Sequence, residues 1–201
     1  MGRIRRVGIL GGSFNPAHGG HLYISRRALH ALALDEVWWL VSPQNPLKAK
    51  AGMAPLAARL AGARALAADG RIRVCDLERV FGTTRTAETL TRLLRRYPKL
   101  RFVWLMGADN LVEIPAWAEW ERIFRTVPIA VFDRPSYSQR AQRSRAARRF
   151  GRNRLRSDEA KELVLRRPPA WIFLRGHFHP ASATEIRAER RRAQYDVTTT
   201  G

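Results

Sequence analysis

The sequence lacks several features that mark large classes of proteins. It has one cysteine, Cys75, among 201 residues, so no intrachain disulfide can form and we expect a reducing, cytoplasmic compartment. Its apolar runs are short, and even the stretch 28–41 is interrupted by His30, Asp35 and Glu36. A bilayer span needs about 20 apolar residues. We therefore expect a soluble chain without an exported or membrane-spanning part.

Acidic residues are also scarce. Asp and Glu total 17 against 37 Lys and Arg, which gives a net charge of +20. This surplus is expected to attract phosphorylated partners and to raise the rate of encounter with them, but it does not distinguish a nucleotide from a nucleic acid. The remaining composition, 45% hydrophobic and 9% aromatic, is that of a globular protein and argues against collagen-like, coiled-coil and wholly disordered chains.

Short β-branched or aromatic runs alternate with longer segments of helical period. This pattern is typical of βα units around a parallel sheet. We predict an α/β fold in one domain, 1–201, with a doubly wound, mostly parallel, Rossmann-like sheet and a C-terminal helical extension. The predicted strands are 5–10, 36–41, 72–77, 101–106, 129–133 and 171–175, and the predicted helices are 20–33, 56–68, 86–97, 117–124 and 182–192.

A glycine-rich turn follows the first predicted strand and opens the first predicted helix. It reads GGSFNPAHGGH over residues 11–21. Glycines let the backbone approach a ligand closely, and the N–H groups at a helix N-terminus bind anions. His18 and His21 lie one turn apart and are expected to face the same ligand. Taken alone, such a pair is more often a set of capping, core or metal-binding histidines, but the strand, the glycine-rich turn and the helix around it favour phosphate binding.

Two other phosphate-binding patterns are absent. The sequence contains neither GxxxxGK[ST] nor GxGxxG, which disfavours a P-loop ATPase and an ordinary dehydrogenase. Instead, residues 12–21 resemble the GxF[DN]PxHxGH signature of the nucleotidyltransferase superfamily. Residues 182–187, SATEIR, resemble its second signature, S[SA]TxIR, within the helical extension at about 177–195.

Within that superfamily, nearly the whole chain is similar to bacterial nicotinate-nucleotide adenylyltransferases. PQNPLK over 43–48 resembles the lysine loop of that family, TRTAETL over 84–90 its SYTxDTL segment, and MGADN over 106–110 its GxD segment. The chain departs from the family pattern at Asn15, Leu47, Arg85 and Glu88, where aspartate, histidine, tyrosine and aspartate are frequent.

The resemblance implies a reaction in NAD biosynthesis. The phosphate of nicotinate mononucleotide attacks the α-phosphorus of ATP, which gives nicotinate adenine dinucleotide and pyrophosphate. No protein nucleophile is needed, because such catalysis depends on positioning and on neutralising charge on phosphate oxygens. Mg²⁺ is expected to accompany ATP, held by phosphate oxygens and water rather than by protein ligands. A homo-oligomer is a possible assembly that the sequence neither predicts nor excludes.

The resemblance also implies the roles of individual residues. The predicted catalytic residues are His18, His21, Lys48 and Arg187. The predicted ATP contacts are Gly11, Gly12, Ser13, Phe14, His18, His21, Gly107, Asp109, Ser182, Thr184 and Arg187. The predicted contacts to nicotinate mononucleotide are Ser13, Asn15, Lys48, Thr86, Trp117 and Arg134.

Several of these residues have a structural alternative. Asp109, and the pair Ser182 and Thr184, could serve as helix caps, Lys48 could be an ordinary exposed lysine, and Arg134 could belong to a surface run. The other tryptophans are expected to pack in the core: Trp38, Trp39, Trp104, Trp120 and Trp171.

Arginines are concentrated between residues 134 and 156, where no acidic residue occurs. A solvated basic helix is the simplest interpretation, and a surface for phosphate or nucleic acid is the alternative. Two rival functions therefore remain. One is an adenylyltransferase for another acceptor, nicotinamide mononucleotide or phosphopantetheine. The other is a nucleic-acid-binding protein, whose affinity would fall steeply with salt.

Overall fold

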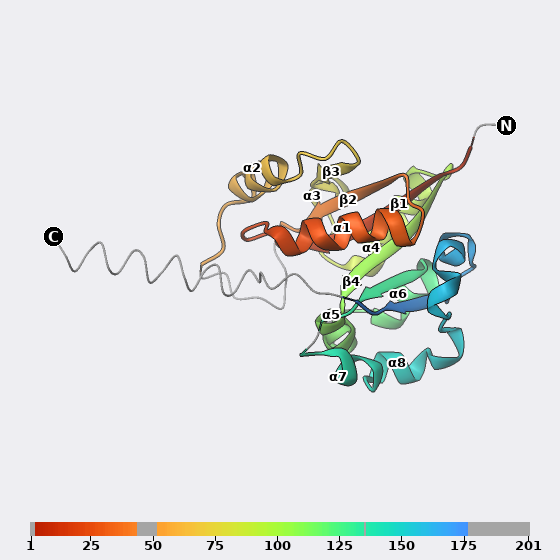
Figure 1. Ribbon diagram of the computed structural model, residues 1–201. Helices are drawn as coiled ribbons and strands as arrows, with labels where there is room; N and C mark the ends of the chain where they lie inside the picture. Colours follow the sequence, from red (N-terminus) through yellow and green to blue (C-terminus); the bar gives the residue numbers. More distant parts are fainter. Residues whose placement is uncertain (1–2, 44–51, 135, 177–201) are drawn as a thin grey trace, which may run out of the picture.

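A six-stranded sheet organises the computed structural model, which describes residues 3–43, 52–134 and 136–176 (Figure 1). The strand order is β3-β2-β1-β4-β5-β6, and every strand pairing among the described residues is parallel. The strands are β1 (Arg5–Gly12), β2 (Glu36–Val41), β3 (Ile72–Cys75), β4 (Leu100–Gly107), β5 (Ile129–Phe132) and β6 (Trp171–Leu174). The predicted doubly wound α/β architecture is confirmed.

Helices cover both faces of the sheet. They are α1 (Gly19–Ala31), α2 (Leu56–Leu66), α3 (Leu77–Phe81), α4 (Thr86–Arg96), α5 (Ala108–Glu113), α6 (Trp120–Thr126), α7 (Ser138–Gln142) and α8 (Arg145–Arg149), with the 3-10 turns η1 (Ile114–Ala116), η2 (Gly151–Asn153) and η3 (Ser157–Leu165). Buried side chains of α1, α2 and η3 pack on one face, and those of α4 to α8 on the other. No helix in the described part of the chain is long and apolar enough to cross a membrane.

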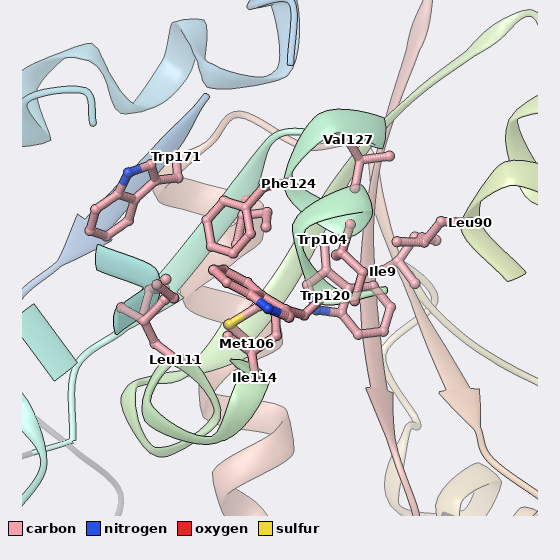
Figure 2. Close-up of a cluster of buried hydrophobic side chains, with 14 of the residues drawn as sticks. Ile9, Leu90, Trp104, Met106, Leu111, Ile114, Trp120, Phe124, Val127 and Trp171 are labelled. Atoms are coloured by element: carbon pink, nitrogen blue, oxygen red, sulfur yellow. The ribbon is translucent and has the colours of Figure 1, made fainter. Parts of the chain in front are cut away.

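The buried central residues of the strands are apolar because both faces of the sheet are covered. All six residues of β2 are buried. In β4, Trp104 and Met106 face the cluster shown in Figure 2, whereas Leu105 faces the opposite one, as the two-residue period of a strand requires. The tryptophans predicted to lie in the core are buried there, which confirms that prediction: Trp38, Trp39, Trp104, Trp120 and Trp171.

The strand order reverses between β1 and β4. From β1 the chain proceeds outward to β3, then crosses back to β4 on the other side of β1. In open α/β sheets such a reversal leaves a crevice at the carboxyl ends of the strands, where ligands bind. The glycine-rich turn follows β1 and therefore lies at this crevice.

Some predicted boundaries are wrong. The helix predicted over 117–124 begins at Trp120, because Glu119 has a left-handed φ of 54° that interrupts it. The strand predicted over 72–77 ends at Cys75, because α3 begins at Leu77. The predicted set omits α3, α5, α7 and α8, since five or six residues give too few turns to show a helical period. The predicted extension at 177–195 lies outside the described residues.

Candidate active site

Packing fixes the end of β1 and the start of the turn that follows it. A Cβ atom at Gly11 would lie 2.3 Å from the Trp104 ring, so a larger residue would displace that buried side chain. Phe14 has a left-handed φ of 47° and a buried ring. The described structure thus gives Gly11 and Phe14 structural reasons to occur, while their contact with ATP stays a prediction.

His18 and His21 cap the first turn of α1. The Gly20 backbone N–H donates to Nδ1 of His18, and the His18 backbone N–H donates to Nδ1 of His21, each at 3.2 Å. Because each Nδ1 accepts a hydrogen bond, the ring hydrogen of the neutral imidazole lies on Nε2. The cap predicted as an alternative role is therefore present. It also orients an Nε2–H donor on each ring, as phosphate binding would require.

Buried side chains of Phe14, Ser25 and Trp39 pack against or hydrogen-bond to His21 and its neighbours. The ring centroids of Phe14 and His21 lie 4.5 Å apart, and those of Phe14 and Trp39 lie 5.1 Å apart. The Ser25 hydroxyl donates to the His21 carbonyl at 2.8 Å and accepts from Nε1 of Trp39 at 2.7 Å. The sequence analysis placed Trp39 in the core but missed this link to the site, because it joins β2 to α1.

Asn15 ties the turn to a distant segment. Its side-chain amide donates to the Gly52 carbonyl at 2.9 Å, and its side-chain oxygen accepts from the Ala54 backbone N–H at 3.1 Å. The residue is only 8% exposed. These bonds give Asn15 a structural task that the sequence analysis did not anticipate, and its contact with nicotinate mononucleotide stays a prediction.

Asp109 and Arg134 meet at the ends of two neighbouring strands. Arg134 follows β5, Asp109 follows β4, and Nη1 of the arginine lies 2.7 Å from Oδ2 of the aspartate. A Cβ atom at Gly107 would lie 2.4 Å from Oδ1 of Asp109, so a larger residue there would require the carboxylate to move. The structure therefore joins residues that the sequence analysis assigned separately to ATP and to nicotinate mononucleotide.

The other predicted site residues are placed as follows. Thr86 is the first residue of α4, and Trp117 follows η1 and packs, half-buried, against the cluster of Figure 2. The Ser13 carbonyl accepts a hydrogen bond from Arg59. Outside the described residues lie Lys48, Ser182, Thr184 and Arg187.

Two groups near the end of β3 titrate unusually. Burial raises the pKa of the Cys75 thiol to about 12, so the thiol stays protonated at neutral pH and is a poor nucleophile. Burial also raises the pKa of Glu78, while a hydrogen bond from Ser42 opposes the rise. No group of three or more His, Cys, Asp or Glu residues suited to a metal occurs in the ranges that the structure describes.

Arg59 is a residue of the site that the sequence did not predict. This residue of α2 is buried, and its guanidinium bonds to backbone carbonyls at the carboxyl ends of β1 and β2. The helix LAARLAGARAL contains two arginines, Arg59 and Arg64. Nothing in this local pattern distinguishes the buried arginine from the exposed one.

Comparisons with known proteins show the family of the chain. Residues 9–189 match the family described as Cytidylyltransferase-like. A protein of Parvibaculum lavamentivorans named "Probable nicotinate-nucleotide adenylyltransferase" is 53% identical over 182 residues, 90% of this chain and 90% of that one. A protein of the same name from Methylorubrum extorquens is 50% identical and covers 90% of this chain and 98% of its own length.

One solved structure resembles the whole arrangement. Plasmodium falciparum nicotinic acid mononucleotide adenylyltransferase, complexed with NaAD, matches with a TM-score of 0.66 over 92% of this chain and 83% of that chain. The two sequences are 16% identical. At that identity the likeness concerns the fold alone.

Proposed function

The chain belongs to the nicotinate-nucleotide adenylyltransferases, within the cytidylyltransferase-like family, and we propose from this membership how its residues act. The enzyme transfers the adenylyl group of ATP to nicotinate mononucleotide, a step of NAD biosynthesis. Nicotinate adenine dinucleotide and pyrophosphate are the products. The observation that carries this function is the 53% identity to a relative of that name over 90% of both chains.

The histidine pair is proposed to hold the phosphates of ATP. During transfer an acceptor phosphate oxygen bonds to the α-phosphorus, while the bond from that phosphorus to the leaving pyrophosphate breaks. Negative charge then grows on the leaving group, and preoriented donors stabilise it. Nε2–H of His18 and His21 are the proposed donors, supported by the bonds that hold each Nδ1. Lys48 and Arg187 are proposed to add positive charge.

The ends of β4 and β5 are proposed to bind the two nucleosides. Asp109 would accept a hydrogen bond from a ribose hydroxyl of ATP, and its contact with Arg134 supports this by fixing the carboxylate. Arg134 would hold the phosphate of nicotinate mononucleotide. Trp117 would stack on the pyridine ring, and Thr86 would donate to the nicotinate carboxylate.

Mg²⁺ is proposed to arrive with ATP. Members of such a family generally use metal-bound ATP, and the described residues offer no group of three or more candidate ligands. Such an ion would be held mainly by phosphate oxygens and water. Bound in that way, the ion would neutralise phosphate charge. We place the reaction in the cytoplasm because the chain has a single cysteine.

Pyrophosphate release tests the proposal directly. Purified full-length chain is mixed with ATP and Mg²⁺, and nicotinate mononucleotide, nicotinamide mononucleotide and phosphopantetheine are compared as acceptors. We expect the highest kcat/KM with nicotinate mononucleotide. Preference for another acceptor would overturn the proposed pyridine pocket and keep the ATP site, whereas no release with any acceptor would overturn the assignment of both.

A further inference from the structure

Arg59 forms an unusual set of hydrogen bonds beside the phosphate-binding turn. Its side chain is buried, with 4% of the residue exposed. Nη1 donates to the carbonyls of Ser13 and Ser42 and Nη2 to that of Pro43, all at 2.7 Å, and Nε donates to the carbonyl of Ala54 at 2.9 Å. All four acceptors are backbone groups, so the guanidinium holds main chain and not side chains.

The four carbonyls belong to segments that are far apart in sequence. Ser13 lies in the turn that leads to His18, 46 positions before Arg59. Ser42 and Pro43 immediately precede the segment 44–51, which contains Lys48, and Ala54 closely follows it. Arg59 therefore connects the turn of the histidines to both flanks of the segment that contains the predicted catalytic lysine.

Asn15 makes the same connection from the other side. It belongs to the histidine turn and bonds to Gly52 and Ala54, so two buried polar side chains join the same two regions. Their bonds are independent of one another, since Asn15 uses the Gly52 carbonyl and the Ala54 N–H, whereas Arg59 uses the Ala54 carbonyl.

The arginine is retained at an energetic cost. Within the described part of the chain no acidic side chain forms an ion pair with Arg59, and burial lowers the pKa of its guanidinium. Burying a charge without a counterion is unfavourable unless its hydrogen bonds are well satisfied. A planar guanidinium directs its donors along fixed, diverging lines, which a lysine ammonium cannot do from one atom. We therefore expect Arg59 to matter because its guanidinium fixes the relative positions of the carbonyls that it binds.

We propose that Arg59 is a positioning residue for adenylyl transfer. It holds the turn that carries His18 and His21 at a fixed spacing from the two flanks of the segment that carries Lys48. This inference rests on the proposed function, because the spacing matters only if the groups act on one pair of reacting phosphates. Misplacing reacting groups by about 1 Å can cost about 100-fold in rate.

The first test compares Arg59→Lys with Arg64→Lys in the full chain. Arg64 lies on the same helix, is exposed, and makes no ion pair or side-chain hydrogen bond among the residues described. We expect Arg59→Lys to lower kcat about 100-fold, with smaller changes in KM for either substrate and with a folded far-UV spectrum. Arg64→Lys should match wild type in kcat, KM and Tm. Wild-type kinetics in Arg59→Lys would overturn the inference.

Chemical rescue separates positioning from a purely structural role. Arg59→Ala removes the guanidinium and leaves a space that free guanidinium ion, at millimolar concentration, can enter. We expect guanidinium to restore part of the lost kcat of a variant that is already fully folded, and to have no effect on Arg64→Ala. This variant decides the question if Arg59→Lys does not fold.

Failure of the inference and failure of the proposed function give different results. The positioning role would be overturned if the kcat of the Arg59 variants fell only in proportion to the fraction of folded protein. It would also be overturned if guanidinium did not change the kcat of Arg59→Ala. In either case Arg59 would contribute to stability alone. A folded wild-type chain that forms no nicotinate adenine dinucleotide would overturn the proposed function itself.

Discussion

Arginine serves opposite purposes in two regions of the molecule. At the carboxyl ends of β1 and β2, one buried guanidinium satisfies backbone carbonyls from three segments. In the segment 138–156, exposed arginines lie over aromatic rings. The Cζ atom of Arg145 is 5.8 Å from the Trp120 ring centroid, and that of Arg154 is 5.2 Å from the Trp171 ring centroid. The density of arginine therefore does not locate the site.

Arginines of the segment 138–156 form ion pairs with acidic residues outside the segment. Arg149 pairs with Glu121 of α6, and Arg156 pairs with Asp158. The segment is not the single basic helix predicted from the sequence, because it divides into α7, α8 and η2. Exposed pairs of this kind contribute about 0–1 kcal/mol each. Their geometry favours surface packing over a nucleic-acid site, while the rival function stays untested.

The largest loss of kcat is expected from a change at His21, which lies in the region of the site and not in the arginine-rich segment. In His21→Asn the amide oxygen can still accept the His18 backbone N–H, but the Nε2–H donor is lost. Since one preoriented donor to a developing charge is worth a factor of about 100 to 1000, kcat should fall by that amount. Steady-state kinetics with ATP and nicotinate mononucleotide measure the loss.

A matched change on the same helix serves as the control for His21. His30 lies in the last turn of α1 and is exposed, so His30→Asn should leave kcat near the wild-type value. Equal kcat in the two variants, with both chains folded, would remove His21 from the catalytic mechanism.

An intermediate effect, on the free energy of unfolding, is expected from the hydrogen bond between Trp39 and Ser25. Trp39→Phe removes the indole N–H that donates to Ser25. Trp38→Phe makes the same change of ring at a position whose buried indole nitrogen has no hydrogen-bond partner among the described residues. Trp39→Phe should therefore destabilise the protein more than Trp38→Phe does, by about 1–3 kcal/mol. Equal free energies of unfolding in urea would contradict the role of the Ser25 bond.

The smallest effect is expected in the arginine-rich segment. Arg154→Gln removes stacking on Trp171 and should lower the free energy of unfolding by about 0.5–1 kcal/mol. Arg152 is exposed and lies over no aromatic ring among the described residues, so Arg152→Gln should stay within about 0.5 kcal/mol of wild type. Neither change should alter kcat. A kcat loss in Arg152→Gln comparable to that of Arg59→Lys would abolish the distinction between the two regions.

Local pattern was enough to predict the strands and the longer helices. β2 is recognisable because an unbroken apolar run follows Glu36, as expected of a strand covered on both faces. The 11-residue helix α4 is long enough to show its period. The short helix α8 is not, and the start of α6 depends on the left-handed Glu119, which no propensity of glutamate indicates.

The candidate site divides in the same way. The cap formed by His18 and His21 joins residues three positions apart, within reach of a local sequence argument. The contact between Asp109 and Arg134 joins residues 25 positions apart. It exists only because β4 and β5 are neighbours in the sheet.

The sequence by itself determined the alternation of strands and helices, the turn at the end of β1 and the histidine cap, because each depends on residues within a few positions of one another. Only the tertiary structure decided which arginine is buried, since α2 contains both Arg59 and Arg64 in similar local surroundings. Arg59 finds its acceptors because parallel strands bring the carbonyls of Ser13 and Ser42 to one edge of the sheet. That convergence depends on long-range packing, which a local reading of the chain does not contain.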